Sequence, residues 1–516
     1  MTILSGWSSI LTAVCLTTLV TLLLQASRRK VPKCASFPPG PTRLPLLGSV
    51  HLLPQQFQER TLAEWGTKYG GIVYAKLFRT PAIVINSYKI AHDLMEKRSG
   101  NYSDRPRFIL IPELLGWKNS IVHLRYGEQF RMHRKWMQDA FRSKEALDSY
   151  RSIQRREVSV FLANLLSTPE AFMTHFTQFS ASIIMEIVYG HRVLNDKDKF
   201  IGIAERAGES TVTAGSPATM LVDFFPIMKL IPEWCPGGGF KTKAAVAHKY
   251  VSELYEVPYR MVREKMKSGT ARPSFTSNLL ERRDRVGKLT LEDEENIKAA
   301  AATVYSAGTE TTATAMMTFI LAMVRHPSIY SKLQDEVDRV VGLERLPDFE
   351  DRAALPYTEC VIKELYRWHV PVPLGIPHNT LKSDIYGGYH IPENAMVIAN
   401  IWAMSQDEDI YPNPTDFNPE RYMDNAEEDP KNIVFGFGRR QCPGNELADR
   451  SIFILVTSIA ATMNITKVKD TSRAEITPSL DFTSGFVSRP EAFSCEITAR
   501  SDKAVRLIRQ MKVATE

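Results

Sequence analysis

The first 27 residues carry no charged side chain, and Arg28, Arg29 and Lys30 follow them at once. Residues 3–24 are almost entirely apolar or hydroxyl-bearing, and as a helix they would span ~33 Å, about the core of a bilayer. A cleaved signal peptide is the alternative, but it would have a basic start and a shorter apolar run. The pattern favours an uncleaved transmembrane anchor over residues 1–27, with the rest of the chain in the cytosol.

A basic and proline-rich stretch, residues 28–48, follows the anchor and includes Phe-Pro-Pro-Gly-Pro at 37–41. Prolines fix φ and remove N–H donors, so this stretch is expected to be a stiff, extended linker. No repeat, low-complexity tract or long charge block interrupts residues 49–516. We expect these residues to form a single large catalytic domain.

Most of the body has a helical pattern. Residues 72–85 predict a short β-hairpin broken at Thr80-Pro81, and more short strands are expected around residues 381–400. A helix is also predicted over residues 445–463. The fold class is therefore mainly α with a small β portion.

One predicted helix is unusually long. Thr290 is a plausible N-cap, three acids follow in the first turn, and His326-Pro327 ends the pattern. Between residues 299 and 324 the only charge is Glu310, so a second membrane span has to be considered. Seven of those 26 residues are Ser or Thr, which favours a helix buried inside a large protein. An acid at its centre is costly without a partner or a task.

Composition excludes several classes. Lys and Arg number 64 against 58 Asp and Glu, and half of the surplus lies in residues 28–30, which is too little for a nucleic-acid-binding surface. The six cysteines are scattered with no Cys-x-x-Cys pair, which argues against a disulfide scaffold or a zinc ribbon and suits a reducing compartment. The sequons at Asn101 and Asn464 would then be chance matches.

The strongest chemical signal is the stretch 435–444, in which Cys442 lies between glycine-rich turns and just before a predicted helix. Free N–H groups at a helix start and the nearby Arg440 favour a thiolate. A lone thiolate with no Cys or His close by suggests haem more than zinc. A buried structural cysteine is the ordinary interpretation of a lone cysteine, but the flanking pattern argues against it.

This stretch resembles the haem-binding signature of cytochrome P450 monooxygenases, Phe-x-x-Gly-x-Arg-x-Cys-x-Gly. The matching residues are Phe435, Gly438, Arg440, Cys442 and Gly444. The resemblance implies the P450 fold, with Cys442 as the axial ligand of a haem b iron and Arg440 as a haem-propionate contact. Thiolate donation to the iron favours O–O cleavage.

Other motifs agree in order along the chain. Glu364 and Arg367 are three apart on a helix, by themselves an ordinary surface pair. The resemblance implies that Arg421, from a Pro-Glu-Arg segment, joins them in a buried ion network with a structural role.

Residues 307–312 resemble the family's oxygen-activation segment. Gly308 would leave room above a flat cofactor, and Glu310 and Thr311 would relay protons to oxygen. A polar notch in a buried helix is the alternative.

Two correspondences are weaker. Phe130 replaces the family's usual Trp, so the hydrogen bond of that Trp to a propionate is lost, whereas Arg134 matches the family's Arg and can pair with a propionate. His378 lies where the family often has an Arg or His at the haem edge; a solvent-side loop histidine is the alternative.

The resemblance also implies a pocket lined mostly by large apolar side chains, although several candidates can equally be plain core residues. These candidates are Phe108, Ile111, Phe224, Ala307, Val372, Leu374 and Phe486.

The chain is most similar to the fungal, membrane-anchored group of the family. This implies an enzyme of the endoplasmic reticulum membrane that inserts one oxygen atom into a lipophilic small molecule. The chain has no flavin- or dinucleotide-binding segment, so NADPH acts only through a separate NADPH-cytochrome P450 reductase, with cytochrome b5 as a further candidate donor. A terpenoid, polyketide or aromatic alkaloid precursor is the expected substrate, and oxidation of foreign aromatics is equally compatible.

Two other classes remain as alternatives. A haem-thiolate isomerase, dehydratase or peroxide-using enzyme would not need Glu310 and Thr311. A membrane haem carrier or sensor would not need a closed apolar pocket.

Overall fold

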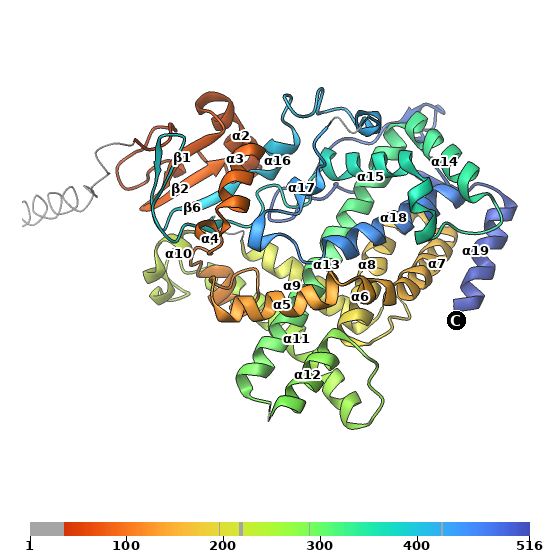
Figure 1. Cartoon of the computed structure of the whole chain (residues 1–516), viewed down its shortest axis with the longest axis horizontal. Helices are drawn as coiled ribbons and strands as arrows, with labels where there is room; N and C mark the ends of the chain where they lie inside the picture. Colours follow the sequence, from red (N-terminus) through yellow and green to blue (C-terminus); the bar gives the residue numbers. More distant parts are fainter. Residues whose placement is uncertain (1–35, 196, 216–219, 288, 425–426, 516) are drawn as a thin grey trace, which may run out of the picture.

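The computed structural model describes residues 36–195, 197–215, 220–287, 289–424 and 427–515. Helices make up most of this part of the chain, and the larger β-sheet lies at one end, near the start of the described residues (Figure 1). The prediction of a mainly α fold with a small β portion is confirmed. The expected anchor, residues 1–27, lies outside the described residues. No helix within the described ranges is both long and apolar enough to cross a bilayer.

The helices fall into two sequential groups. The first group is η1 (Val50–Leu52), α2 (Gln58–Tyr69), α3 (Tyr88–Ala91), η2 (His92–Lys97), α4 (Ser99–Tyr102), η3 (Leu110–Leu114), α5 (Glu128–Phe141), α6 (Lys144–Ser149), α7 (Arg151–Ser167), η4 (Pro169–Ala171), α8 (Phe172–Tyr189), α9 (Lys199–Ala214), α10 (Leu221–Phe224), η5 (Pro226–Leu230) and α11 (Phe240–Lys267). The second group is α12 (Phe275–Val286), α13 (Leu291–Arg325), α14 (Pro327–Val341), η6 (Phe349–Ala354), α15 (Pro356–Trp368), α16 (Ile401–Ser405), η7 (Pro419–Tyr422), α17 (Lys431–Val434), η8 (Gly438–Arg440), α18 (Asn445–Thr462) and α19 (Asp502–Thr515).

The strands are short and come from distant parts of the chain. They are β1 (Ile72–Leu77), β2 (Thr80–Ile85), β3 (His378–Asn379), β4 (Asp384–Tyr386), β5 (Tyr389–Ile391), β6 (Met396–Ala399), β7 (Met463–Thr466), β8 (Val468–Lys469), β9 (Glu475–Ile476) and β10 (Glu496–Ala499). The largest sheet has the order β1-β2-β6-β3, with β2 and β6 parallel and the other pairs antiparallel.

The hairpin predicted over residues 72–85 is present, but its expected break is wrong. The turn is Phe78-Arg79, where Phe78 has a φ of 54°, and Pro81 lies inside β2 opposite Lys76. Alternate residues of β2 belong to two different hydrophobic clusters, Ile83 to one and Val84 to the other. Pro81 lies before the part of β2 that pairs with β6, which begins at Ala82, so the position next to the turn tolerates a residue without an N–H.

The long helix α13 matches its prediction to within one residue. The Thr290 side chain accepts a hydrogen bond from the Asp293 N–H, and the Asp293 carboxylate accepts one from the Thr290 N–H. The helix packs against α8, α11, α12 and α18, and most of its side chains are buried in the main core. The interpretation as a helix of the protein interior is therefore confirmed.

Candidate functional site

Cys442 lies in the loop between η8 and α18. Its N–H donates to the Phe435 carbonyl over 2.8 Å, which closes the loop. Gly438 has a φ of 56°, and a Cβ added to it would lie 2.2 Å from the carbonyl oxygen of Met95 in η2. The Gly438 N–H also donates to the Glu96 carboxylate. Only glycine fits this close approach, so Gly438 fixes the loop against η2.

The Cys442 thiol experiences opposing effects. Burial raises its pKa and is the largest effect, whereas the N–H groups of Gly444 and Asn445 and the charges of Arg134 and Arg142 lower it. The N–H groups at the helix start thus act as expected, and the arginines that act with them are Arg134 and Arg142 in place of the expected Arg440, but burial outweighs them and the net shift is upward. A metal cation bound to the sulfur supplies the positive charge that a buried thiolate needs.

Arg440 binds the backbone of the segment before α5 and does not act on the sulfur. Its N–H groups donate to the carbonyl oxygens of Ser103, Ile121 and Leu124 over 2.8, 3.0 and 2.7 Å. Its guanidinium carbon lies 3.7 Å from the ring centroid of Phe130. The phenylalanine at the expected tryptophan position therefore supports Arg440 through a cation–π contact. Two of the five guanidinium N–H groups are left for a ligand.

Arg440 lies in a buried cationic cluster with Arg105, His123 and His378. The sequence analysis missed Arg105 and His123. Arg105 donates to three backbone carbonyls, two of them at residues 376 and 377, just before His378. The Nδ1 atom of His378 lies 2.6 Å from the Tyr102 carbonyl oxygen, so this histidine is a buried residue of the cluster and not a solvent-side one.

The cluster has more positive than negative charge. Burial, with Arg440, holds the pKa of Arg105 well below its usual range, and burial lowers the pKa of Arg440 to about 9. Burial with both arginines lowers the pKa of His123 to about 3 and that of His378 well below its usual range. Asp104 opposes the lowering of the pKa of the two arginines, and Arg125 binds this carboxylate as well. A ligand with carboxylates, such as haem, fits this buried cationic group.

Arg134 on α5 holds the backbone beside the cysteine by donating to the carbonyl oxygen of Gln441. Burial lowers the pKa of Arg134, with Arg142 acting in the same direction and Cys442 against it. Arg134 thus connects Cys442 to the cluster, because its charge also lowers the pKa of Arg440.

The predicted oxygen-activation segment lies at the middle of α13. The Thr311 hydroxyl donates to the Ala307 carbonyl over 2.8 Å, and Ala307 and Glu310 are exposed although most of the helix is buried. Surrounding protein still raises the pKa of Glu310, opposed by the charge of Arg489. A Cβ on Gly308 would lie 3.0 Å from Ile184 on α8, so this glycine allows α8 and α13 to pack closely, and the room that it would leave above a cofactor stays a prediction.

The structure brings the Glu364, Arg367 and Arg421 side chains together without solvent. Glu364 and Arg367 are fully buried, and two guanidinium nitrogens of Arg367 lie 2.8 and 2.7 Å from the carboxylate oxygens of Glu364. Arg421 donates to the same carboxylate over 3.3 Å, and the backbone N–H of Asn418 does so over 2.8 Å. Helix α15 is thus tied to the segment that precedes the cysteine loop.

The candidate pocket residues occupy different environments. Phe108 is buried in a cluster on one face of the sheet, and Phe224 and Leu374 pack against that cluster. Ile111 belongs to the main helical core. Val372 and Phe486 are half-buried. The candidates that are not fully buried are the better ones for contact with a ligand, namely Phe224, Ala307, Val372, Leu374 and Phe486.

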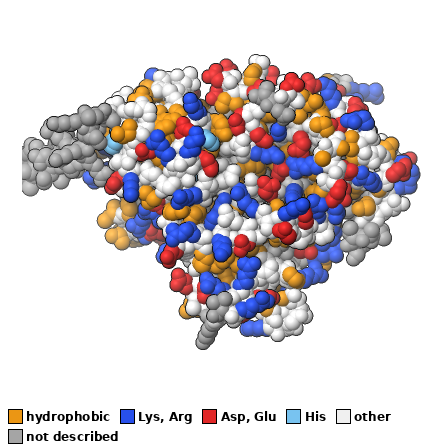
Figure 2. All heavy atoms as spheres, viewed as in Figure 1, with side chains coloured by type: hydrophobic (Ala, Val, Ile, Leu, Met, Phe, Trp, Pro, Cys, Tyr) orange, Lys and Arg blue, Asp and Glu red, His pale blue; other side chains and the backbone are white. Residues whose placement is uncertain are grey.

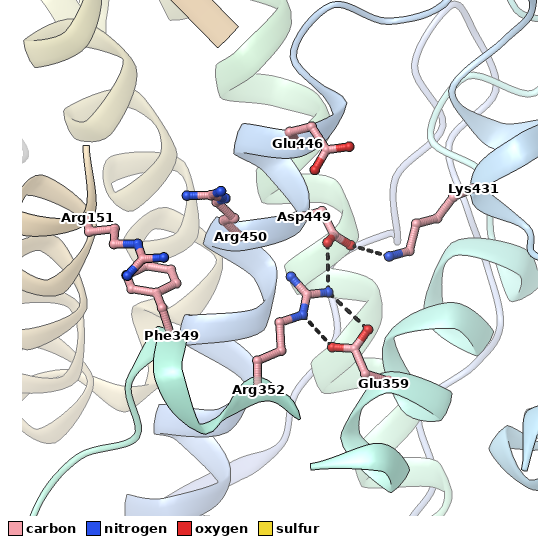
Figure 3. A pocket seen from close by; sticks show the side chains of 8 residues that line it. All are labelled: Arg151, Phe349, Arg352, Glu359, Lys431, Glu446, Asp449 and Arg450. Atoms are coloured by element: carbon pink, nitrogen blue, oxygen red, sulfur yellow. Dashed lines mark hydrogen bonds and ion pairs between the residues drawn. The ribbon is translucent and has the colours of Figure 1, made fainter. Parts of the chain in front are cut away.

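Sequence reasoning also missed a charged pocket of about 440 Å³ at the surface (Figure 3). Figure 3 shows Asp449 of α18 facing Arg352 and Lys431, at 2.7 and 3.1 Å, while Arg352 also binds Glu359. Burial acts to raise the pKa of Asp449, but Arg352 and Lys431 hold it below its ordinary value. The pair of Lys431 and Asp449 joins α17, before the cysteine loop, to α18, after it, and Arg352 adds η6 to this connection.

Comparison with known proteins places this site in a family. The sequence profile of cytochrome P450 matches residues 38–496. The chain is 45% identical to cytochrome P450 monooxygenase 136 of Postia placenta, over 92% of this chain and 90% of that protein. It is 39% identical to cytochrome P450 monooxygenase claR of Ampulloclitocybe clavipes, over 92% and 88% of the two chains. It is 37% identical to cytochrome P450 monooxygenase ple1 of Rhodocybe pseudopiperita, over 92% and 91%.

The cysteine loop, the buried ion network and these matches define an oxidoreductase of the monooxygenase class. The chain belongs to the cytochrome P450 family. This family uses haem, and both the free cysteine at a helix start and the excess of buried positive charge fit that group.

Proposed function

We propose that this P450 inserts one atom of dioxygen into a lipophilic intermediate of fungal secondary metabolism, of the terpenoid, polyketide or aromatic alkaloid type. The observation that carries the proposal is the connection through Arg134 between Cys442 and the buried arginines. Such an arrangement suits a flat group with a metal at its centre and carboxylates at its edge. The relatives described above are fungal monooxygenases, which supports the proposed setting.

Different residues would bind different parts of the haem. Cys442 would provide the sulfur ligand of the iron of haem b, and Arg105, Arg440 and His378 would hold its carboxylates. The chemistry that haem supplies when bound is the reductive splitting of dioxygen. Arg134, bonded to the backbone beside Cys442, keeps the sulfur in place.

Glu310 and Thr311 would move the protons that leave with the second oxygen atom as water. Thr311→Ala removes a hydroxyl on the open part of α13, and product formed per NADPH should fall about tenfold, with hydrogen peroxide released instead. Thr309→Ala is a matched control, because Thr309 makes the same type of bond, to the Tyr305 carbonyl over 2.8 Å, but is buried. If the two variants form the same amount of product per NADPH, Thr311 has no role in proton transfer.

The electron donor would dock beside the cysteine loop. A surface pocket of about 410 Å³ borders Gln441, the residue next to Cys442. Its lining includes three cations and one acid, namely Arg142, Lys144, Arg450 and Glu446. This surface suits an acidic flavoprotein such as NADPH-cytochrome P450 reductase, with cytochrome b5 as a second candidate.

Membrane contact is supported by an exposed apolar surface formed by residues 44–52 and 221–234. Leu46, Ile227, Leu230 and Trp234 are 76%, 72%, 76% and 84% exposed. Both segments adjoin Phe78, whose N–H donates to the residue 47 carbonyl and whose ring contacts residues 224 and 225. Hydrophobic side chains are visible in Figure 2 at the end where Figure 1 places α10. Together with the apolar residues 3–24, this surface supports attachment to a bilayer.

The proposed location is the cytosolic side of the endoplasmic reticulum membrane. The cysteines among the described residues are free, which suits a reducing compartment. The Asn101 amide donates to the Lys382 carbonyl and accepts from the Lys382 N–H, so both of its ends are engaged within the protein. Brominated lipids in vesicles should quench Trp234 fluorescence of the full chain; no difference between wild type and Trp234→Phe would refute this contact.

The decisive test of function is co-expression with the reductase in a host supplied with candidate substrates, followed by mass spectrometry. With ¹⁸O-labelled dioxygen, one labelled oxygen atom should enter each product. Turnover without NADPH and reductase, or unlabelled product, would instead indicate a haem-thiolate isomerase or dehydratase.

A further inference from the structure

Helix α9 contains two interior glycines, Gly202 and Gly208. A glycine inside a helix costs roughly 1 kcal/mol relative to alanine, so each calls for a local reason. A Cβ on Gly202 would meet only the end of the flexible Arg206 side chain. A Cβ on Gly208 would meet Glu310 of α13, with Oε1 at 3.3 Å and Cδ at 3.7 Å. The two glycines of one helix therefore have different surroundings.

The Glu310 carboxyl has little else to fix its position. Among the described residues it has no hydrogen-bond or ion-pair partner. The charged group that acts on it is Arg489, in a loop closed by hydrogen bonds between Thr483 and Arg489. The Glu310 carboxyl thus occupies the space that a side chain at position 208 would fill, and the absence of that side chain lets it lie there.

Gly208 itself is well anchored in the protein. Its neighbour Ala207 is fully buried, and one turn later the Thr211 hydroxyl accepts a hydrogen bond from the indole N–H of the buried Trp117 over 3.2 Å. This part of α9 therefore presents a fixed surface to Glu310.

We propose that Gly208 is a positioning residue: without a side chain it leaves the space beside α9 that the Glu310 carboxyl occupies, and so links the position of α9 to proton transfer. This inference rests on the proposed relay role of Glu310. A separation of 3.3 Å between an added Cβ and the Glu310 Oε1 is tighter than ordinary van der Waals contact, so a methyl group at position 208 would displace the carboxyl by a few tenths of an ångström.

The test compares Gly208→Ala with Gly202→Ala in the full-length enzyme. Both substitutions replace a helix glycine by alanine, and both should keep or raise the thermal unfolding midpoint. Only Gly208→Ala should raise the pKa of Glu310, because a methyl group against the carboxyl excludes water. Infrared difference titration measures this pKa from the carboxyl signal that is absent in Glu310→Gln.

Catalysis provides a second readout. Gly208→Ala should lower product formed per NADPH by about threefold, whereas Gly202→Ala should not. In the Glu310→Gln background, Gly208→Ala should have no further effect, since there is no carboxylic acid left to position.

The outcomes separate the two hypotheses. If Glu310→Gln couples as well as the wild type, the proposed relay role fails, and the infrared titration alone decides the role of Gly208. If Glu310→Gln uncouples but Gly208→Ala changes neither the infrared pKa nor the coupling, Gly208 does not position the carboxyl. An equal effect of Gly208→Ala with and without the Glu310 carboxyl would also overturn the proposal.

Discussion

Glu364→Gln should strongly destabilise the haem-binding part of the protein, because it removes the one carboxylate between two buried arginines. All five N–H groups of Arg367 are occupied, two by Glu364 and three by the carbonyls of Ser405, Pro414 and Asp416. The neutral amide would leave that guanidinium charge uncompensated and turn an N–H group toward existing donors. Breaking a buried ion pair in this way costs about 3–5 kcal/mol.

Glu359→Gln on the same helix is a matched control. Glu359 also pairs with an arginine, Arg352, but both side chains are about a quarter exposed, at 27% and 25%. Its loss should cost about 1 kcal/mol or less. The assay is urea unfolding together with the fraction of purified protein that carries haem. Similar losses of unfolding free energy and of haem content in the two variants would refute the reasoning that burial makes the Glu364 network stabilising.

Three further predictions follow from the site and its surroundings. Cys442→Ala should leave much of the fold intact but abolish the red-shifted absorption of the ferrous, carbon-monoxide-treated protein; retention of that absorption would exclude Cys442 as the ligand. Burial lowers the pKa of His133 to about 4, so the unfolded chain binds a proton there between about pH 6.5 and 4 while the folded one does not. Stability should therefore fall as the pH drops through this window, and less steeply in His133→Asn; an unchanged slope would contradict this. Lys144→Glu should raise the KM for the reductase several-fold at low salt, unlike Lys243→Glu on α11, and equal effects would argue against docking beside the cysteine loop.

Local patterns predicted the elements whose structure is decided within a few residues. Thr290 and Asp293 cap α13 because a hydroxyl and a carboxylate three positions apart satisfy free N–H groups wherever the chain runs. Helix α18 begins after the Cys442 loop as expected. The hairpin was also predictable, but its turn was not, since Pro81 fits a strand position that the local pattern does not reveal.

Long-range contacts explain the failures. The close packing at Gly308 gave no signal in the sequence, because its partner Ile184 lies more than 100 residues earlier. Asp449 gave no signal, because its partners Arg352 and Lys431 come from separate segments. Arg105 gave a weak signal in the sequence, because it is a charged residue just before an apolar loop. Its role in the cationic cluster depends on Arg440, which is distant in the sequence.

The sequence alone determined the cysteine, its glycines and the order of the motifs, because these features depend on backbone conformation and residue chemistry over short stretches. Tertiary structure decided which charges surround each group. Burial outweighs the local helix start at Cys442, two arginines lie together without an equal number of acids, and Glu310 occupies the space left by a glycine of another helix. Burial and charge at these sites arise from segments that meet only when the whole chain has folded.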